Sequence, residues 1–275
     1  MTDVTAIGGR GRRARRLFNI HALRRGGTRL QLSLAGGVRA DEPVTVAFVT
    51  VLVLSLYFAL LPGVDMAVSA LFYSPGAGFI LADNPVLRGL RKSSTWVLGL
   101  MLLGLIGEIV LALRRNPRRL TGWGRRAAVL IAGLVIASGF LVNGVLKSMW
   151  GRARPIQIEG FGGDADFTRA WQLSDNCLSN CSFVSGEGSS AAWMVAVAVL
   201  MVPAPWRRWA LPAVMTYAAA LSINRIAFGG HFLSDILLSW ALTGLVIAAL
   251  HRLALACPRT VRQIRRARRR SGKIA

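Results

Sequence analysis

Six apolar stretches limit the folds that this sequence can adopt. They cover approximately residues 43–62, 95–113, 127–147, 189–204, 210–227 and 232–252. Each is close to the roughly 20 residues that a helix needs to cross the hydrocarbon core of a bilayer, and the fourth is the shortest. The pattern therefore predicts an all-α, polytopic membrane protein with six transmembrane helices and a membrane domain at residues 43–252.

Positive charge alternates along the connections between these stretches. Arginines fill the second connection, the fourth connection and the C-terminal residues 253–275; those in the two connections are Arg114, Arg115, Arg118, Arg119, Arg125, Arg126, Arg207 and Arg208. The positive-inside rule places these regions and both termini in the cytoplasm. Segments 63–94, 148–188 and 228–231 then face the other side. The last is so short that the fifth and sixth helices must form a tight hairpin.

The composition agrees with a membrane protein. The chain has 275 residues, is 53% hydrophobic and carries a formal net charge of +22. Its arginines lie in short clusters between apolar stretches and form no separate basic domain, so we expect no nucleic-acid partner. Residues 1–42 and 253–275 are predicted to be basic cytoplasmic tails, the first disordered. They are either attracted to anionic lipids or simply solvated. No cleavable signal peptide is evident, because the first apolar stretch begins only after the basic tail.

Two features stand out in the segments predicted to face outward. Residues 63–94 mix apolar and turn residues, which is typical of an interfacial helix and loop at a lipid entrance, or of a plain connector. Cys177 and Cys181 lie four residues apart, and an oxidising exterior favours a disulfide between them. A metal pair is less favoured, because no third or fourth Cys or His ligand lies on that face.

An ionisable cluster lies between the last two apolar stretches. Arg225, His231 and Asp235 follow one another within eleven residues, and charged groups near bilayer depth are costly unless they serve a function. If a helix runs from Phe232 onward, His231 and Asp235 share one face at the i, i+4 spacing. The carboxylate would then orient the imidazole, as in an activated nucleophile or base.

Further cations and a helix start are expected on the same side. Lys147 ends the third stretch and Arg154 follows seven residues later, so a continuing helix would put both on one side. Residues 183–190 form a Gly/Ser-rich opening to the fourth stretch, whose N-terminus would offer free N–H groups to an anion. Three cations and a helix N-terminus together point to a bound oxyanion, most simply a phosphate.

The three parts occur in a recognisable order: Lys147-x6-Arg154-Pro155, then Ser185-Gly186, then Arg225-x5-His231-x3-Asp235. This pattern resembles the three-part signature of the type 2 phosphatidic acid phosphatase family, whose superfamily also includes the vanadium haloperoxidases. The resemblance covers roughly residues 43–252. Taken singly, Arg225 could be a snorkelling anchor, Lys147 the end of a span and Gly186 a packing position. Their joint occurrence in family order favours the site.

The resemblance implies a role for each matching residue. His231 would attack phosphorus and form a phosphohistidine, and Asp235 would hold its ring in the correct tautomer. The phosphoryl oxygens would be bound by Lys147, Arg154, Arg225, Ser185 and the Gly186 N–H. The resemblance implies no metal and no other cofactor, because fixed cations would stabilise the charge.

Two positions depart from the family pattern, one in the second motif and one in the third. The family usually has His where this chain has Glu187, and Ser where it has Asn224. The usual His protonates the leaving group and then activates water. Glu187 could do both if it were protonated at the right step. If it stays ionised, it is a poor acid and repels phosphate. A better leaving group, such as a pyrophosphate or a glycosyl phosphate, would then need less acid assistance.

The resemblance implies a lipid phosphatase of the bacterial inner membrane with a periplasmic active site. We expect an envelope lipid as substrate, lipid A 1-phosphate or undecaprenyl pyrophosphate before phosphatidic acid or phosphatidylglycerophosphate. One alternative is a phosphotransferase that passes the phosphate to a second lipid, and another is a non-catalytic lipid-phosphate binder with Glu187 in place of the usual His. A transporter is disfavoured, because the charges gather at one face without an obvious inverted repeat.

Overall fold

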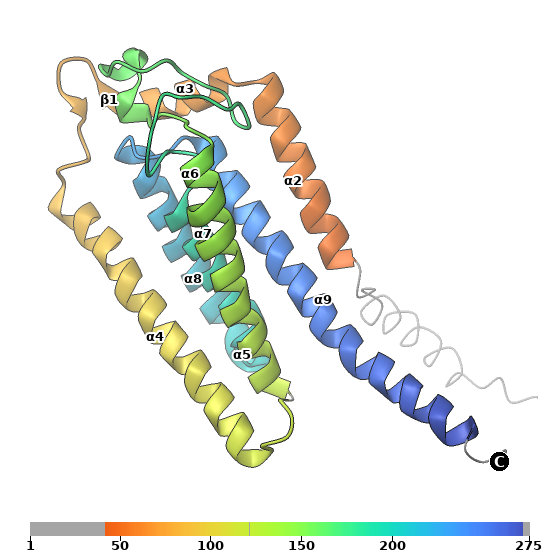
Figure 1. Ribbon diagram of the computed structural model, residues 1–275. Helices are drawn as coiled ribbons and strands as arrows, with labels where there is room; N and C mark the ends of the chain where they lie inside the picture. Colours follow the sequence, from red (N-terminus) through yellow and green to blue (C-terminus); the bar gives the residue numbers. More distant parts are fainter. Residues whose placement is uncertain (1–41, 121, 272–275) are drawn as a thin grey trace, which may run out of the picture. The chain divides into compact units, whose positions relative to one another are not determined.

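The computed structural model describes residues 42–120 and 122–271. The predicted tail at residues 1–42 lies outside the described part except for its last residue, as do the last four residues of the predicted tail at 253–275. Six long helical segments account for most of the described part, and each overlaps one predicted apolar stretch (Figure 1). They are α2 (Glu42–Leu60), α4 (Pro85–Arg115), the continuous run α5 (Gly122–Gly133), η1 (Leu134–Leu146) and α6 (Lys147–Met149), α7 (Gly186–Met201), α8 (Ala204–Ala227) and α9 (Leu233–Ser271).

Several of these helices have the character of membrane spans. Within the described residues, four are long and apolar enough to cross a bilayer: α2, α4, the run Gly122–Met149 and the part of α9 at Leu233–Ala256. Helix α7 is apolar but shorter. Large apolar side chains on α2 and α4 point outward, with Leu56 61% and Leu100 68% exposed, as lipid-facing residues do. The membrane character is confirmed, and six crossings remain a prediction.

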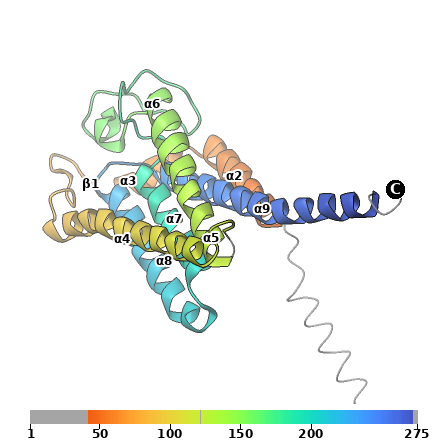
Figure 2. The ribbon, with the colours of Figure 1, turned by 60° about the horizontal axis from the view of Figure 1, so that its bottom comes forward.

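Successive long helices run in alternating directions (Figures 1 and 2). Helix α2 packs on α9, α4 packs on α5, and α7 contacts both α8 and α9. The core between them is built around Trp193 and Met194 of α7, which pack with Leu130 of α5. The indole N–H of Trp193 also donates to the Leu130 carbonyl at 2.7 Å. Helix α7 is therefore packed against neighbouring helices on several sides, and these contacts fix the position of its N-terminus.

Irregular segments gather at one end of the helices and form a cap (Figure 1). It contains α3 (Gly63–Ala70), the short antiparallel hairpin of β1 (Tyr73–Ser74) and β2 (Gly78–Phe79), the 3-10 turns η2 (Pro155–Gln157) and η3 (Glu159–Phe161), and the loop that leads to α7. The described part of the chain is mostly helical, as predicted. The all-α prediction did not include this small hairpin. The basic connections α4–α5 and α7–α8 lie at the opposite end.

Several helix boundaries differ from expectation. Helix α8 begins six residues before its predicted stretch, and α9 continues to Ser271, into the predicted tail at residues 253–275. Helix α4 begins ten residues before the predicted apolar stretch, because the Asn84 side chain accepts hydrogen bonds from the N–H groups of Val86 and Leu87 and so caps the helix. The expected helix through Lys147 and Arg154 was wrong. It ends at Met149, and Gly151 then turns the chain with a φ of +66°.

Candidate functional site

The turn between α8 and α9 brings the predicted Arg225, His231 and Asp235 together. Gly229 adopts a φ of +62°, which turns the chain sharply. A Cβ atom at position 230 would clash with the Arg225 guanidinium, so glycine there leaves room for that group. The side chains of all three polar residues are almost fully buried, with at most 4% exposed.

His231 is held differently from the helical pairing expected. It precedes α9, which begins at Leu233, so it shares no helix with Asp235. Its Nδ1 lies 2.8 Å from the Ser182 carbonyl and 3.8 Å from Asp235 Oδ2. Since a carbonyl only accepts, Nδ1 carries the proton and Nε2 keeps its lone pair. Burial lowers the pKa of His231 to about 4, against the opposing effect of Asp235.

Asp235 supports the position of His231 indirectly, through Ser182. Its Oδ2 accepts hydrogen bonds from Ser182 Oγ at 2.5 Å and from the Phe232 N–H at 2.9 Å. It therefore caps the start of α9 and fixes the segment whose carbonyl holds His231. Its Oδ1 accepts from Arg152 at 2.7 Å.

Arg152 was missed in the sequence, although it is fully buried at the centre of the network. It donates to Asp235 and to Asp65 Oδ2 at 2.9 Å, and to the oxygen atoms of Ser234 and Thr168. Asp65 comes from α3 and also accepts from the Ser234 N–H at 2.8 Å. Two features of the sequence could have identified this pair. Arg152 is a second arginine two residues before Arg154, and Asp65 is a lone carboxylate in the apolar part of segment 63–94.

The N-terminus of α7 forms as predicted. Ser185 is the cap, and its Oγ accepts from the Gly188 N–H at 3.0 Å. Close packing explains the glycines: a Cβ on Gly186 would come 2.8 Å from Asn143 Oδ1, and one on Gly188 would come 2.5 Å from Ser239 Oγ. Larger residues would push this helix start away from its neighbours.

Lys147 and Arg154 converge on a third residue, Asn180. The Asn180 side-chain oxygen accepts from Lys147 Nζ at 3.2 Å, and its carbonyl accepts from Arg154 at 2.8 and 3.2 Å. Asn180 has a φ of +51° and lies in the small loop that the disulfide Cys177–Cys181 closes, with a Cα–Cα distance of 5.6 Å. Two oxygens of one residue thus occupy the positions that phosphate oxygens would take on these cations.

Glu187 forms ion pairs with two further cations, Arg91 and Arg225. Its Oε1 accepts from Arg91 Nε at 3.0 Å, and its Oε2 lies 3.5 Å from Arg225 Nε. Arg225 Nε is buried and makes no hydrogen bond within the described part of the chain. Arg91 was missed because residues 85–94 were read as part of a connecting segment, whereas they form the first turns of α4. Lys147 and Arg225 both act electrostatically on His231.

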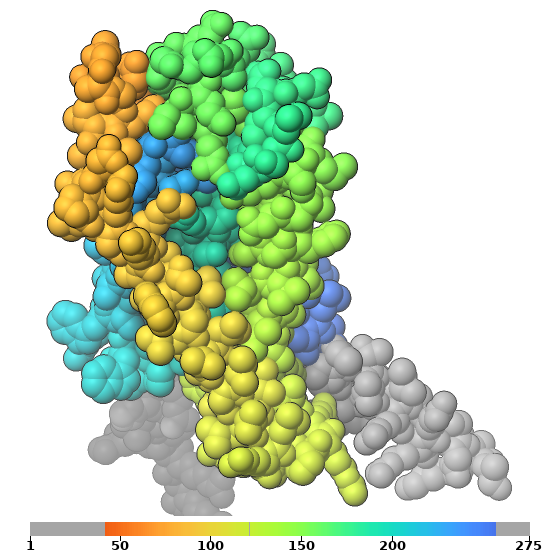
Figure 3. Space-filling view, turned by 60° about the vertical axis from the view of Figure 1, so that its left-hand side comes forward, coloured from red at the N-terminus to blue at the C-terminus, as the bar shows by residue number. Residues whose placement is uncertain are grey.

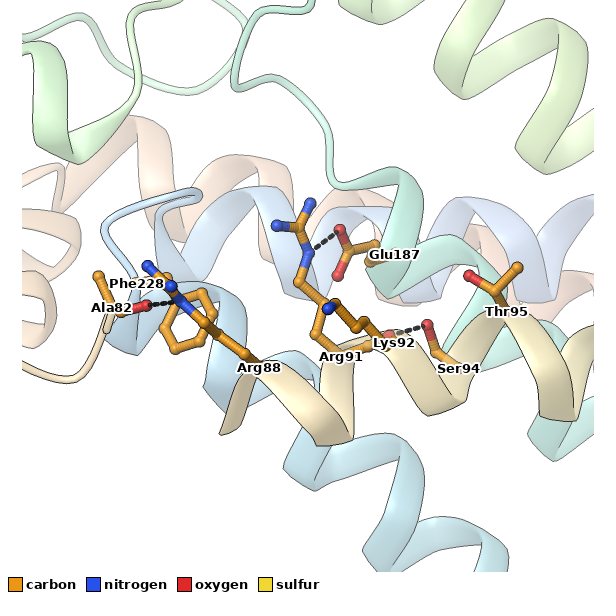
Figure 4. Close-up of a pocket in the computed structure, with 8 residues that line it drawn as sticks. All are labelled: Ala82, Arg88, Arg91, Lys92, Ser94, Thr95, Glu187 and Phe228. Atoms are coloured by element: carbon orange, nitrogen blue, oxygen red, sulfur yellow. Dashed lines mark hydrogen bonds and ion pairs between the residues drawn. The ribbon is translucent and has the colours of Figure 1, made fainter. Parts of the chain in front are cut away.

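The site opens onto a hollow in the surface. Figure 3 shows it between α4 with its preceding segment on one side and the cap on the other, with α7 and the chain around the start of α9 at its floor. Two cavities, of about 590 and 280 Å³, lie here and share Ser94, Thr95 and Glu187. The smaller one also reaches Lys147 and Gly186. Figure 4 shows Arg91 of α4 pointing toward Glu187 in the larger one.

The arrangement suits chemistry at a phosphate group. A neutral imidazole with one free nitrogen lies among fixed cations and beside a helix N-terminus, which together can bind and polarise an oxyanion. Among the described residues, no group of three or more His, Cys, Asp and Glu side chains is placed to hold a metal ion.

Sequence comparison identifies relatives of the region that forms this site. Residues 128–259 match the sequence model of the PAP2 superfamily. The lipid A 4'-phosphatases of Rhizobium etli and Rhizobium leguminosarum are 42% and 45% identical over 126 and 130 residues. Each alignment covers 46% of this chain, and 49% or 54% of the relative. The Francisella tularensis subsp. novicida lipid A 4'-phosphatase is 38% identical over 113 residues, 41% of this chain and 51% of its own.

These comparisons confirm the resemblance predicted from the three motifs. The chain spans about half the length of the curated relatives it matches. The crystal structure of the transmembrane PAP2 type phosphatidylglycerolphosphate phosphatase from Bacillus subtilis superposes with a TM-score of 0.50 at 20% identity, over 80% of this chain and 98% of that one. At this identity the likeness concerns the fold.

Proposed function

The chain carries a PAP2 superfamily segment at residues 128–259, and from it we propose an integral-membrane lipid phosphatase that acts on an envelope lipid. The observation that carries the proposal is the setting of His231. Its Nδ1 is engaged by the Ser182 carbonyl at 2.8 Å, while Lys147 and Arg225 lie around the same ring. An imidazole with one nitrogen fixed and the other free, beside fixed cations, is suited to attack a bound phosphate.

The reaction would proceed in two displacements. His231 Nε2 forms a bond to phosphorus as the bond from phosphorus to the lipid oxygen breaks, which leaves a phosphohistidine. Water then attacks phosphorus, the P–N bond breaks, and inorganic phosphate leaves. Lys147, Arg154 and Arg225 would bind the phosphoryl oxygens, together with Ser185 and the Gly186 N–H. Phosphate would have to displace the Asn180 oxygens from Lys147 and Arg154.

Glu187 would serve the second displacement better than the first. Its side-chain oxygens face Arg91 and Arg225, and a carboxylate accepts a proton but has none to donate. It can therefore take the proton of the attacking water. The lipid alkoxide that leaves in the first step would be stabilised by the surrounding guanidinium groups and would take its proton from water, and the proton that Glu187 accepts in the second step returns to the solvent. A glycosyl phosphate needs less acid assistance than a simple alkyl ester.

The relatives favour lipid A among the predicted substrates, because three of them are lipid A 4'-phosphatases. We propose a phosphate on the sugar headgroup of such a lipid, reached from the membrane surface while the acyl chains stay in the bilayer. We also propose that all six helices cross the bacterial inner membrane, with both termini in the cytoplasm and the cap in the periplasm. The position of the basic connections, at the end of the helices opposite to the cap, supports this orientation.

The test is phosphate release by detergent-purified protein from lipid A, undecaprenyl pyrophosphate, phosphatidic acid and phosphatidylglycerophosphate. Wild type is compared with His231→Ala and with the matched control His251→Ala. His251 lies on α9 beside Arg125 and Arg126, in a separate cavity. We expect release from lipid A that His231→Ala abolishes and His251→Ala leaves intact. Release that survives His231→Ala would contradict the proposal.

The same assay separates the alternatives. Glu187→Gln is expected to slow turnover and to let the phosphohistidine accumulate, as a lost base predicts. Phosphate that appears in a second lipid, with free phosphate absent unless an acceptor is added, would identify a phosphotransferase. Lipid A binding without turnover in the folded wild-type protein would identify a non-catalytic binder.

A further inference from the structure

The larger cavity beside the site has an unusually cationic wall. It is lined by Ala82, Arg88, Arg91, Lys92, Ser94, Thr95, Glu187 and Phe228, as Figure 4 shows. Arg88, Arg91 and Lys92 are three and four residues apart at the start of α4, so the helix presents them on one face. The Ser94 and Thr95 hydroxyls add hydrogen-bonding capacity next to them. The wall thus holds three cations and one carboxylate.

The protein's own anions satisfy these cations only in part. Arg88 pairs with Asp83, whose side chain is 90% exposed, and such surface pairs contribute little. Arg91 pairs with Glu187, which also contacts Arg225. Lys92 makes no ion pair within the described residues. The cavity therefore retains cationic capacity for an external anion.

The cavity lies directly beside the reaction centre. Glu187 separates the two, with one carboxylate oxygen toward Arg91 of the cavity and the other toward Arg225. The smaller cavity shares Glu187, Ser94 and Thr95 and continues to Lys147. A headgroup with one phosphate near His231 can therefore extend past Glu187 to the start of α4.

The membrane orientation strengthens the argument. In the proposed topology, the start of α4 faces the periplasm, where the positive-inside rule disfavours Arg and Lys close to a span. Three cations in the first two turns are also unfavourable beside the positive end of the helix dipole. Their placement thus runs against two general preferences, which an anionic ligand would offset.

We propose that Arg88, Arg91 and Lys92 form a second anion subsite, which binds another phosphate group on the headgroup of the same substrate molecule. This inference rests on the proposed function and deepens it, because it makes the preferred substrate a lipid with two phosphates. Arg91 would be shared, since it contacts the subsite and, through Glu187, the reaction centre. Arg88 and Lys92 would serve the subsite alone.

The test compares two forms of one disaccharide lipid that differ in a single phosphate, one form bisphosphorylated and the other monophosphorylated at the hydrolysed position. The double variant Arg88→Gln/Lys92→Gln removes two charges from the subsite. Its matched control, Arg114→Gln/Arg115→Gln, removes two from the far end of the same helix. We expect the ratio of kcat/KM for the two lipids to fall about tenfold or more in the first variant, as two lost charge-assisted contacts predict, and to stay unchanged in the control. An unchanged ratio in the subsite variant would overturn the proposal.

A binding measurement keeps the inference separate from the proposed function. Both lipids are titrated onto His231→Ala protein in nanodiscs, with and without the two subsite substitutions. The subsite is supported if the bisphosphorylated lipid binds preferentially and the two substitutions remove this preference. This holds even if no lipid is turned over. Equal affinities of the two lipids, together with binding of inorganic phosphate or phosphatidylglycerol that the two substitutions remove, would mean that the site takes a free or neighbouring phosphate, and would overturn the same-molecule assignment.

Discussion

His231 is buried against a backbone carbonyl, and this setting determines how it titrates. Its pKa is lowered to about 4 from an ordinary value near 6.5, because burial disfavours the imidazolium. The ring is therefore neutral, and able to attack, throughout the physiological range. We expect its nitrogen resonances in 15N-histidine-labelled protein to show no titration between pH 8 and 5.5, with His231→Ala identifying the signals. A midpoint near 6.5 would contradict the buried setting.

The same shift links stability to pH. Between pH 6.5 and 4 the unfolded chain binds a proton at this residue that the folded chain does not, so acidification lowers the free energy of unfolding. The loss develops below pH 6.5 and is complete below pH 4, where it amounts to about 3 kcal/mol. Thermal unfolding of His231→Ala should accordingly show a weaker decline over this window than wild type.

Arg152 connects α3, α9 and the loop before α7, so its removal is expected to be severe. Arg152→Ala would leave Asp65 and Asp235 buried without their shared cation, which typically costs about 3–5 kcal/mol. We expect a large fall in the midpoint of thermal unfolding in detergent. The matched control is Arg169→Ala in the same outer segment, since Arg169 is exposed and should change the midpoint little. Equal effects of the two substitutions would show that the buried network does not stabilise the cap.

At the residue scale, the sequence predicted which side chains meet but not how they are held. The fold brings the expected charged residues near one another, since Lys147, Arg154, Arg225, His231 and Asp235 act electrostatically on one another. The hydrogen-bond partners were not predictable. Ser182, Asn180 and Asp65 belong to no motif. The oxygens of Ser182 and Asn180 reach the site only through loop conformation, and Asp65 is brought to Arg152 by α3. The roles of the site residues remain predictions.

At the element scale, the loop closed by the disulfide Cys177–Cys181 acts as a cover on the cations. Asn180 supplies one oxygen to Lys147 and another to Arg154, so in the proposed reaction a phosphate would have to displace it. Asn180→Ala removes the side-chain oxygen and leaves the carbonyl. We expect inorganic phosphate to inhibit the variant more strongly, by about tenfold or more, because a hydrogen bond to a charged group is worth about 1.5–3 kcal/mol.

The control for this prediction is Asn176, which lies one residue before the loop that the disulfide closes. Asn176 donates its side-chain N–H to the Asp166 carbonyl and contacts neither cation. Asn176→Ala should therefore leave the inhibition constant of phosphate unchanged. If Asn180→Ala weakens phosphate binding, Asn180 orders the site and does not cover it.

The helices themselves were well predicted, and their ends were less so. Apolar stretches located all six long segments, because burial in lipid requires continuous hydrophobicity. The first turns of α4 were missed because they are polar, and hydropathy gives no weight to the Asn84 cap that starts the helix. This error concealed Arg88, Arg91 and Lys92, since residues in a presumed connector are not expected to share a face.

At the scale of the whole described unit, the residues of the candidate site lie at one end of the helices. The arginine-rich connections lie at the other end, a separation that serves both topology and function. The exposed apolar faces of α2 and α4 between these ends suit the bilayer, which would leave the hollow of Figure 3 at the membrane surface. A lipid could present its headgroup there without leaving the membrane.

The orientation of this unit is open to a direct measurement. If both termini are cytoplasmic, a green fluorescent protein fused after Ala275 should fluoresce, and a periplasmic alkaline phosphatase at the same place should be inactive. The same phosphatase inserted at Gly76, in the turn between β1 and β2, should be active. Insertion at Pro117, in the α4–α5 connection, serves as the cytoplasmic control. An active phosphatase at Ala275 or at Pro117 would reverse the orientation and place the site in the cytoplasm, where a periplasmic substrate could not reach it.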